Sequence, residues 1–338
     1  MGHRIINDQK NNTMKLKINI PKHLLLFSLC VAGSTILFQQ NVVAQDSTVV
    51  AEEPVAKAAR VRPVKNTFES IWIIDNQTVM VPNKGSFEMD IMHRFGTVKN
   101  GYDDFWGFFA PSNIRLGVDY APVKNFNFGL GITKNNMLWD GSVKYSIIRQ
   151  TKGIYPVSVS YYANMAYDTR KDPDKSIFKY STQRMSFFNQ LIIARKFSDK
   201  LSVQIAPSVS HQNSVDGYYT KNDSTGKDIF KKMKFDHYAV AVSARYKLTE
   251  VTSLMFNYDQ PLTVHATNNP HPNLSVGFEF NTSGHAFQLF LTNYSGLSPQ
   301  QNNLYNTNNP FGYKDVAGNK VKGGQFLIGF NITRLWSY

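Results

Sequence analysis

Apolar and polar residues alternate along about a dozen segments that follow one another from residue 84 to the C-terminus. In one of these segments, Leu274, Val276 and Phe278 alternate with Ser275 and Gly277. Successive side chains of a β-strand point to opposite faces of the sheet, so this pattern predicts one apolar and one polar face. The expected strands are 85–95, 113–120, 126–133, 139–148, 156–167, 184–197, 201–211, 235–248, 251–259, 273–280, 285–293 and 325–336.

The connections between these strands fall into two length classes. Short turns are expected at 121–125, 149–153, 198–200, 249–250 and 281–284, and most of the other connections are long and polar, at 96–112, 168–183, 212–234, 260–272 and 294–322. Short periplasmic turns that alternate with long outer loops are typical of outer-membrane barrels. We therefore expect an all-β fold, a single antiparallel transmembrane β-barrel of about 12 strands over residues 84–338, with both ends in the periplasm.

The first 44 residues have the order of a secretory signal peptide. From Met14, a basic stretch is followed by an apolar run between Leu24 and Phe38 and then by small residues that end at Ala44. We expect translation to start at Met14 and cleavage to follow Ala44, which places the mature chain in the outer membrane. Cys30, the only cysteine, lies in the apolar run, so the mature chain can form no disulfide.

The next 39 positions fall into two parts of different composition. Residues 45–64 are rich in Ala, Val and Pro with mixed charge, which indicates a flexible periplasmic leader. Residues 65–83 are too apolar for a free linker, and we expect this segment to dock on or in the barrel with Phe68, Trp72 and Ile74 against lumen side chains. In this interpretation Asp75 and Asn76 form a turn and the segment plugs the pore. A thirteenth strand or a periplasmic flap remains an alternative.

Four stretches of the chain resemble a known family. These are TFESIWIIDNQTVMVP (67–82), FEMDIMHRFG (87–96), APSNIRLGVDYAP (110–122) and GLGITKNN (129–136). Together they are similar to a Bacteroidetes-type family of outer-membrane β-barrels that is catalogued as a domain of unknown function. The resemblance extends from Asn66 to the C-terminus and implies the barrel fold and its location, but it supplies no activity and no catalytic residues.

Charged residues inside the expected strands are the strongest physical indication of a lumen. An Arg or Lys that faces lipid at mid-bilayer costs about 2–4 kcal/mol, so these residues should face inward. The lumen-lining candidates are Glu88, Asp90, Arg94, Arg115, Asp119, Asp140, Lys144, Arg245 and Glu279. Two interpretations remain open, a self-neutralising network that fills the barrel and a solute-selective lining. On neighbouring strands Arg115 could pair with Glu88 or Asp90, and Arg94 with Asp119.

Motifs for enzyme chemistry are weak. The sequence contains no hydrolase, zinc or phosphate-loop signature, so no cofactor and no metal site are expected. A Ser/His pair on neighbouring strands, formed by His211 or His237 with Ser208, Ser210 or Ser243, is the remaining route to a lipid hydrolase. Asp168, Asp172 and Asp174 share one loop, but their spacing matches no calcium loop, and solvated loop charge is the better interpretation.

The basic charge of the chain, +13, does not indicate nucleic-acid binding. Four lysines, Lys227, Lys231, Lys232 and Lys234, end an expected outer loop, where lipopolysaccharide phosphates are near. Headgroup contact, or merely a soluble loop, is the expected role, because neither motif nor compartment fits nucleic-acid binding. The expected partners are outer-membrane lipid, lipopolysaccharide and a small solute, and the oligomeric state is left open. The sequence thus predicts a non-enzymatic protein, a narrow passive channel for small polar or anionic solutes. A closed scaffold or partner-docking barrel is the alternative, and a lipid hydrolase is third.

Overall fold

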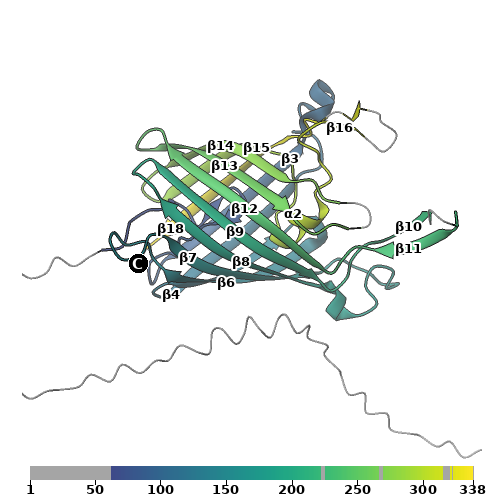
Figure 1. Ribbon diagram of the computed structural model, residues 1–338, viewed down its shortest axis with the longest axis horizontal. Coiled ribbons are helices and arrows are strands. Elements are labelled where there is room, and N and C mark those ends of the chain that lie inside the picture. Colours follow the sequence, from purple (N-terminus) through teal and green to yellow (C-terminus); the bar gives the residue numbers. More distant parts are fainter. Residues whose placement is uncertain (1–61, 222–224, 266–268, 315–319, 322, 338) are drawn as a thin grey trace, which may run out of the picture. The chain divides into compact units, whose positions relative to one another are not determined.

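Twelve antiparallel strands close a barrel in the computed structural model, which describes residues 62–337 except 222–224, 266–268, 315–319 and 322 (Figure 1). The strands are β3 (Phe87–Thr97), β4 (Asn113–Val123), β5 (Phe126–Thr133), β6 (Leu138–Ile148), β7 (Ser158–Asp168), β8 (Met185–Lys196), β9 (Leu201–Gln212), β12 (Asp236–Lys247), β13 (Thr252–Pro261), β14 (Asn273–Asn281), β15 (His285–Thr292) and β18 (Leu327–Trp336). Each overlaps its expected range, so the predicted fold class is confirmed. The expected signal peptide and most of the leader lie outside the described residues.

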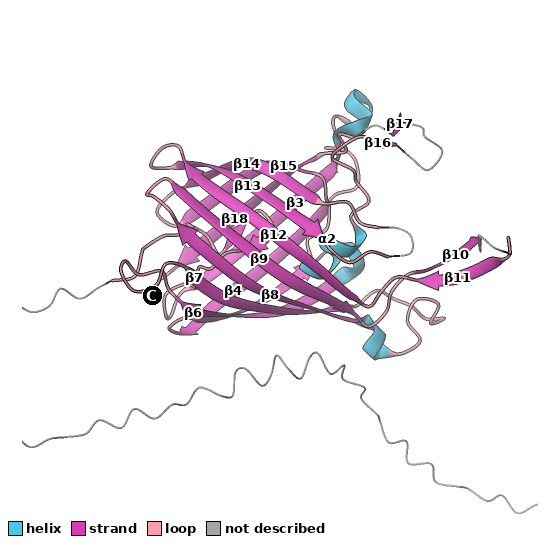
Figure 2. Ribbon diagram, in the orientation of Figure 1, coloured by secondary structure: helices cyan, strands magenta, loops and turns pink. Residues whose placement is uncertain are grey.

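Strand β18 closes the barrel by pairing with β3, the first strand of the wall. Their register joins Trp336 to Phe87 and Phe330 to His93, with one irregularity between Leu327 and Gly329. All other wall strands pair with their neighbours along the chain, and the long excursion between β9 and β12 carries the small hairpin of β10 (Gly217–Lys221) and β11 (Asp228–Lys232) outside the wall (Figure 2). The barrel therefore has no free sheet edge.

The barrel is apolar on its outside and polar on its inside. Leu130 is 60% exposed and Leu289 is 53% exposed on the outer surface, whereas the charged side chains of Glu88 and Glu279 are buried. A water-soluble protein shows the opposite distribution, because apolar side chains leave water and charged ones stay in it. The alternation thus has the polarity that a lipid-facing wall requires.

Both ends of the described wall lie at the end of the barrel that carries the short turns (Figure 1). The turns there comprise residues 124–125, 149–157, 197–200, 248–251 and 282–284. The second of these is longer than the expected 149–153, because Thr151 forms β-bridges with both Tyr155 and Pro63. The segment that precedes the barrel is therefore paired to this turn.

Several short elements lie in the loops at the opposite end. They are the 3-10 helices η1 (Val98–Asp104), η2 (Asn135–Met137) and η3 (Ser181–Arg184), the helix α2 (Pro299–Tyr305), and the two-residue strands β16 (Tyr313–Lys314) and β17 (Lys320–Val321). Within the described part of the chain, no helix is long and apolar enough to cross a membrane. Of these elements only α2 is described below, because its residues reach the lumen.

Candidate functional site

A hairpin from the segment before the barrel occupies the lumen. Strands β1 (Trp72–Ile73) and β2 (Asn76–Gln77) pair with each other and with no strand of the wall. Ile74 and Asp75 connect them, so the turn lies one residue earlier than expected. Ile74 has a φ of 61°, an uncommon conformation for a β-branched residue, and packing and hydrogen bonds on all sides hold it there.

Apolar side chains of the hairpin segment pack against an apolar patch on the inner wall. Phe68, Ile73, Ile74 and Val79 belong to one buried cluster with wall residues Tyr162, Phe188, Ile192, Ala194, Ala206, Ala241, Met255 and Phe290. Trp72 lies in a second cluster with Ile71, Met92 and Leu297. The three residues expected to face the lumen wall, Phe68, Trp72 and Ile74, are thus all buried inside the barrel.

Carboxamide and hydroxyl side chains of the wall bind the hairpin backbone. Gln288 donates to the Trp72 carbonyl at 3.0 Å, Gln204 to the Gln77 carbonyl at 2.9 Å, and Ser160 to the Val79 carbonyl at 2.9 Å. These bonds satisfy backbone groups that have no partner in so short a sheet. Side chains of the wall therefore provide the hydrogen bonds that neighbouring strands would provide in a larger sheet.

The outer loop between β15 and β18 enters the lumen from the other end. Helix α2 carries Gln300 and Leu304, both fully buried, and the Gln300 amide donates to Asn164 of β7. Asn302 of the same helix donates to Asp75 at 3.2 Å. The hairpin tip and the outer loop thus meet inside the barrel.

Asp75 is the polar point of contact between the two inserted segments, which also meet where Ile71 and Trp72 pack with Leu297. Its carboxylate accepts hydrogen bonds from the Tyr294 hydroxyl, from Asn302 of the loop and from Asn257 of the wall at 3.1 Å. Burial raises the pKa of the Asp75 carboxyl, and the Tyr294 hydroxyl and the charge of Arg94 partly offset this rise. The lumen is therefore occupied from both ends, and hydrogen bonds to Asp75 help to join the two inserted segments.

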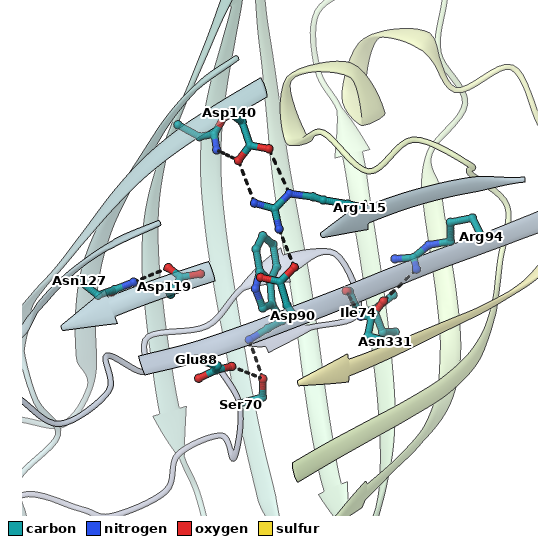
Figure 3. A network of polar contacts seen from close by, with 12 residues as sticks. Ser70, Ile74, Glu88, Asp90, Arg94, Arg115, Asp119, Asn127, Asp140 and Asn331 are labelled. Atoms are coloured by element: carbon teal, nitrogen blue, oxygen red, sulfur yellow. Dashed lines mark hydrogen bonds and ion pairs between the residues drawn. The ribbon is translucent and has the colours of Figure 1, made fainter. Parts of the chain in front are cut away.

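Arg115 is the centre of the charge network in the lumen (Figure 3). Its Nη1 lies 2.7 Å from Asp90, and its Nε and Nη2 donate to the two oxygens of Asp140 at 3.1 and 2.8 Å. The Trp72 ring lies 5.5 Å from its guanidinium carbon. Of the two partners expected for Arg115, Asp90 therefore forms the ion pair and Glu88 does not. Asp140 is a second partner, which was not expected.

The remaining lumen charges are mostly bonded as well. Arg245 pairs with Glu279 at 2.8 Å and with Glu69 of the hairpin segment at 3.5 Å. Lys144 donates to Gln77 of the hairpin at 2.6 Å. Asp119 accepts from Asn127 at 2.7 Å, and Glu88 accepts from Ser70 at 3.5 Å.

Arg94 differs from the other lumen cations. Its Nη1 donates to Asn331 at 2.9 Å and to the His93 carbonyl at 3.0 Å, while its Nε and Nη2 have no partner among the described residues. The expected pair with Asp119 is wrong. In register, Arg94 lies opposite Asn113, and Asp119 is six residues further along β4, about 20 Å away at the rise of a strand.

The candidates for a hydrolase lie on the neighbouring strands β9 and β12, where His237 is directly opposite Ser210, but no hydrogen bond joins these two side chains. His211 binds Asp236 at 2.7 Å, His237 binds His265 at 3.1 Å, and Ser243 donates to Asn257 at 2.6 Å. In the described part of the chain no serine–histidine hydrogen bond joins the residues expected for a hydrolase. Of the three loop aspartates, Asp168 is paired with Arg170 at 2.8 Å.

The inward carboxamides that hold the hairpin were missed by the sequence analysis, which searched strands for charges. Gln204, Gln288, Asn257 and Asn331 all lie at inward positions of wall strands, and a search for inward Asn and Gln would have found them. The insertion of α2 was also missed. Its only sequence signal is the Asn- and Gln-rich stretch 300–309, whose uncharged polar side chains can hydrogen-bond to a polar lumen.

An apolar outer wall around a polar lumen defines a membrane-bound β-barrel protein. The chain belongs to the family described as membrane bound beta barrel domain (DUF5777), whose profile matches residues 68–336. The family expected from the resemblance is thereby confirmed. No curated protein matches the chain significantly.

Several solved structures are similar to the chain at low sequence identity. The NanC porin is 8% identical with a TM-score of 0.42, over 75% of this chain and 99% of the porin. The KdgM porin is 10% identical with a TM-score of 0.38, over 74% and 99%. An outer membrane channel from Pseudomonas putida F1 is 10% identical with a TM-score of 0.37, over 76% and 97%.

Proposed function

We propose that this protein is an outer-membrane channel for small polar or anionic solutes whose lumen is closed by its own segment 65–83. The observation that carries the proposal is that the occupant of the lumen is not part of the wall. The twelve wall strands pair completely with one another, and the hairpin of β1 and β2 forms a separate sheet. The wall would therefore keep its hydrogen bonds if the hairpin left.

The size and chemistry of the vacated space suit a narrow channel. Paired strands lie about 5 Å apart, so a lumen that holds a hairpin with its side chains is wide enough for a small solute. Barrels of eight strands are filled by side chains and those of 16 to 18 hold open channels, so twelve is intermediate. Ser160, Gln204, Asn257 and Gln288 would then face water, which can replace the hydrogen bonds to the hairpin.

A second candidate, a permanently closed scaffold barrel, is favoured by the apolar inner patch. Phe188, Ile192 and Met255 are buried in one cluster with the hairpin segment, and removal of that segment would uncover part of this patch. Exposure of such a patch is unfavourable by about 25 cal/mol for each Å² uncovered. The two candidates differ in one measurable property, because only the channel conducts once the segment is removed.

Single-channel recording in planar bilayers separates them. Deletion of residues 45–83 should raise the conductance from near zero to steady open events, and a heat-modifiable band on an electrophoresis gel should confirm that the deleted barrel is folded. An unchanged conductance, both in this folded barrel and in one that also lacks the lumen helix α2, would reject the channel in favour of the scaffold.

A cysteine pair provides a matched control. The Ser70 and Thr333 hydroxyls lie 3.5 Å apart and join the hairpin segment to the wall, so S70C/T333C should lock the lumen shut when oxidised and release it when reduced. The Ser86 and Ser337 hydroxyls lie 3.1 Å apart between neighbouring ends of the wall. S86C/S337C should therefore show no dependence of conductance on oxidation.

A further inference from the structure

Every lumen arginine except Arg94 has its Nε–Nη2 edge occupied by carboxylates. Arg115 presents this edge to both oxygens of Asp140, and Arg245 presents it to Glu279 and Glu69. This edge of a guanidinium donates two parallel hydrogen bonds and matches the spacing of carboxylate or phosphate oxygens. In the other two lumen arginines, Arg115 and Arg245, this edge therefore binds carboxylate groups.

The same edge of Arg94 has no hydrogen-bond partner among the described residues. The Arg94 side chain is fully buried, and both Nε and Nη2 lack a hydrogen-bond partner there. Asp75, which interacts electrostatically with Arg94, is engaged by three other donors and forms no ion pair with it. A buried guanidinium that forms no direct ion pair and leaves two N–H groups unbonded is unfavourable, so its presence needs a reason other than packing.

The surroundings of Arg94 hold its guanidinium in place. The Phe290 ring lies 4.5 Å from its guanidinium carbon, and Asn331 accepts a hydrogen bond from Nη1. Gly329 leaves the room for this arrangement, because a Cβ there would lie 2.9 Å from Cδ of Arg94 and 2.6 Å from the Phe290 ring. The orientation of the free edge is therefore fixed by the wall itself.

Withdrawal of the hairpin would free a donor on the Nη1 side of the guanidinium. The Asn331 amide, which accepts from Arg94, donates to the carbonyl of Ile74 at the hairpin tip. Without the hairpin this N–H is free and lies next to the guanidinium. The position is near the outer end of β3, where the neighbouring Asn113 binds the backbone of the outer loop at Ser295.

We propose that Arg94 is the anion-binding subsite of the lumen, and that its ligand is a small solute with a carboxylate or phosphate group. This inference rests on the proposed function, because Arg94 becomes accessible only when the hairpin leaves. Nε and Nη2 bind two oxygens of the anion, and the Phe290 ring and Asn331 hold the guanidinium in the orientation that this requires.

Equilibrium binding to the refolded barrel that lacks residues 45–83 tests the subsite. Sodium acetate and inorganic phosphate, titrated separately at constant ionic strength in a calorimeter, distinguish a carboxylate from a phosphate ligand. Binding of either anion should weaken about 10- to 100-fold in Arg94→Gln, as expected for lost hydrogen bonds to a charged group. Arg170→Gln, which removes a cation from an outer loop, should bind as the parent does. No binding, or equal binding in Arg94→Gln, would overturn the proposal.

Stability of the full chain provides a second test that needs no deletion. Arg94→Met removes a buried charge that forms no direct ion pair, so the variant should unfold at the same or a higher temperature than the parent. A loss of stability as large as that of Arg115→Met would identify Arg94 as a structural residue and refute the subsite.

The two proposals can fail separately. If the barrel does not conduct but binds anions in a way that depends on Arg94, the channel is rejected and the subsite is supported. In the opposite case, the barrel conducts, but Arg94→Gln changes neither its reversal potential in a potassium chloride gradient nor its affinity for acetate. This result would support the channel and reject the subsite.

Discussion

At the scale of single residues, the direction of the charged side chains could be predicted but not their partners. The bilayer excludes charge, so Glu88, Arg115 and Arg245 had to face inward whatever the register. Pairing depends on the register between strands, and a shift of two residues exchanges one partner for another. In the observed register Glu88 lies opposite Asp119, which leaves Asp90 as the carboxylate diagonal to Arg115.

Neutralisation of Arg115 should destabilise the barrel more than loss of any exposed ion pair. Arg115→Gln would leave Asp90 and Asp140 buried without their cation, and breaking a buried pair typically costs about 3–5 kcal/mol. The control is Lys247→Gln, because its partner Glu250 is 93% exposed and such pairs contribute about 1 kcal/mol or less. Urea unfolding in detergent micelles, followed by tryptophan fluorescence, measures both. Equal losses in the two variants would contradict the central role of Arg115.

At the scale of elements, β8 explains why one expected strand was less regular than the others. Its outward residues Phe187, Leu191 and Ile193 are apolar because they face lipid, and its inward residues Phe188 and Ile192 are apolar because they face the hairpin. A strand that is apolar on both faces is buried on both faces. The irregularity was thus a sequence signal for an occupied lumen, but it could not reveal which segment occupies it.

Two neighbouring isoleucines of β8 provide a matched pair of variants. Ile192→Ala removes contacts to the hairpin and should weaken its docking by about 2–4 kcal/mol, whereas Ile193→Ala alters only the lipid face. The expected result is faster proteolysis at the 65–83 segment in folded Ile192→Ala barrels, with Ile193→Ala close to the parent. Equal proteolysis rates would show that the inner patch does not hold the hairpin.

At the scale of the whole described molecule, the sequence predicted the wall well and the contents of the lumen only in outline. Twelve strands could be located because the alternation and the turn lengths are local signals, independent of contacts far along the chain. The meeting of Asp75 with Tyr294 and Asn302 joins segments more than 200 residues apart, and no local pattern encodes it. The same holds for Gln300, whose partner Asn164 lies on a distant strand.

The alternation of connection lengths also predicts how the barrel lies in the membrane. Single cysteines at Asp199 and Thr282 are in the turns 197–200 and 282–284, at the end where the described chain enters and leaves the wall. A cysteine at the exposed Lys227 lies in the long excursion between β9 and β12. Because short turns face the periplasm in outer-membrane barrels, an impermeant maleimide should label the Lys227→Cys protein on intact cells and leave the other two unlabelled. Disruption of the outer membrane should then expose Asp199→Cys and Thr282→Cys, which confirms that both are reactive. Labelling of either turn on intact cells would invert the topology, and the 65–83 segment would then enter the barrel from the outside.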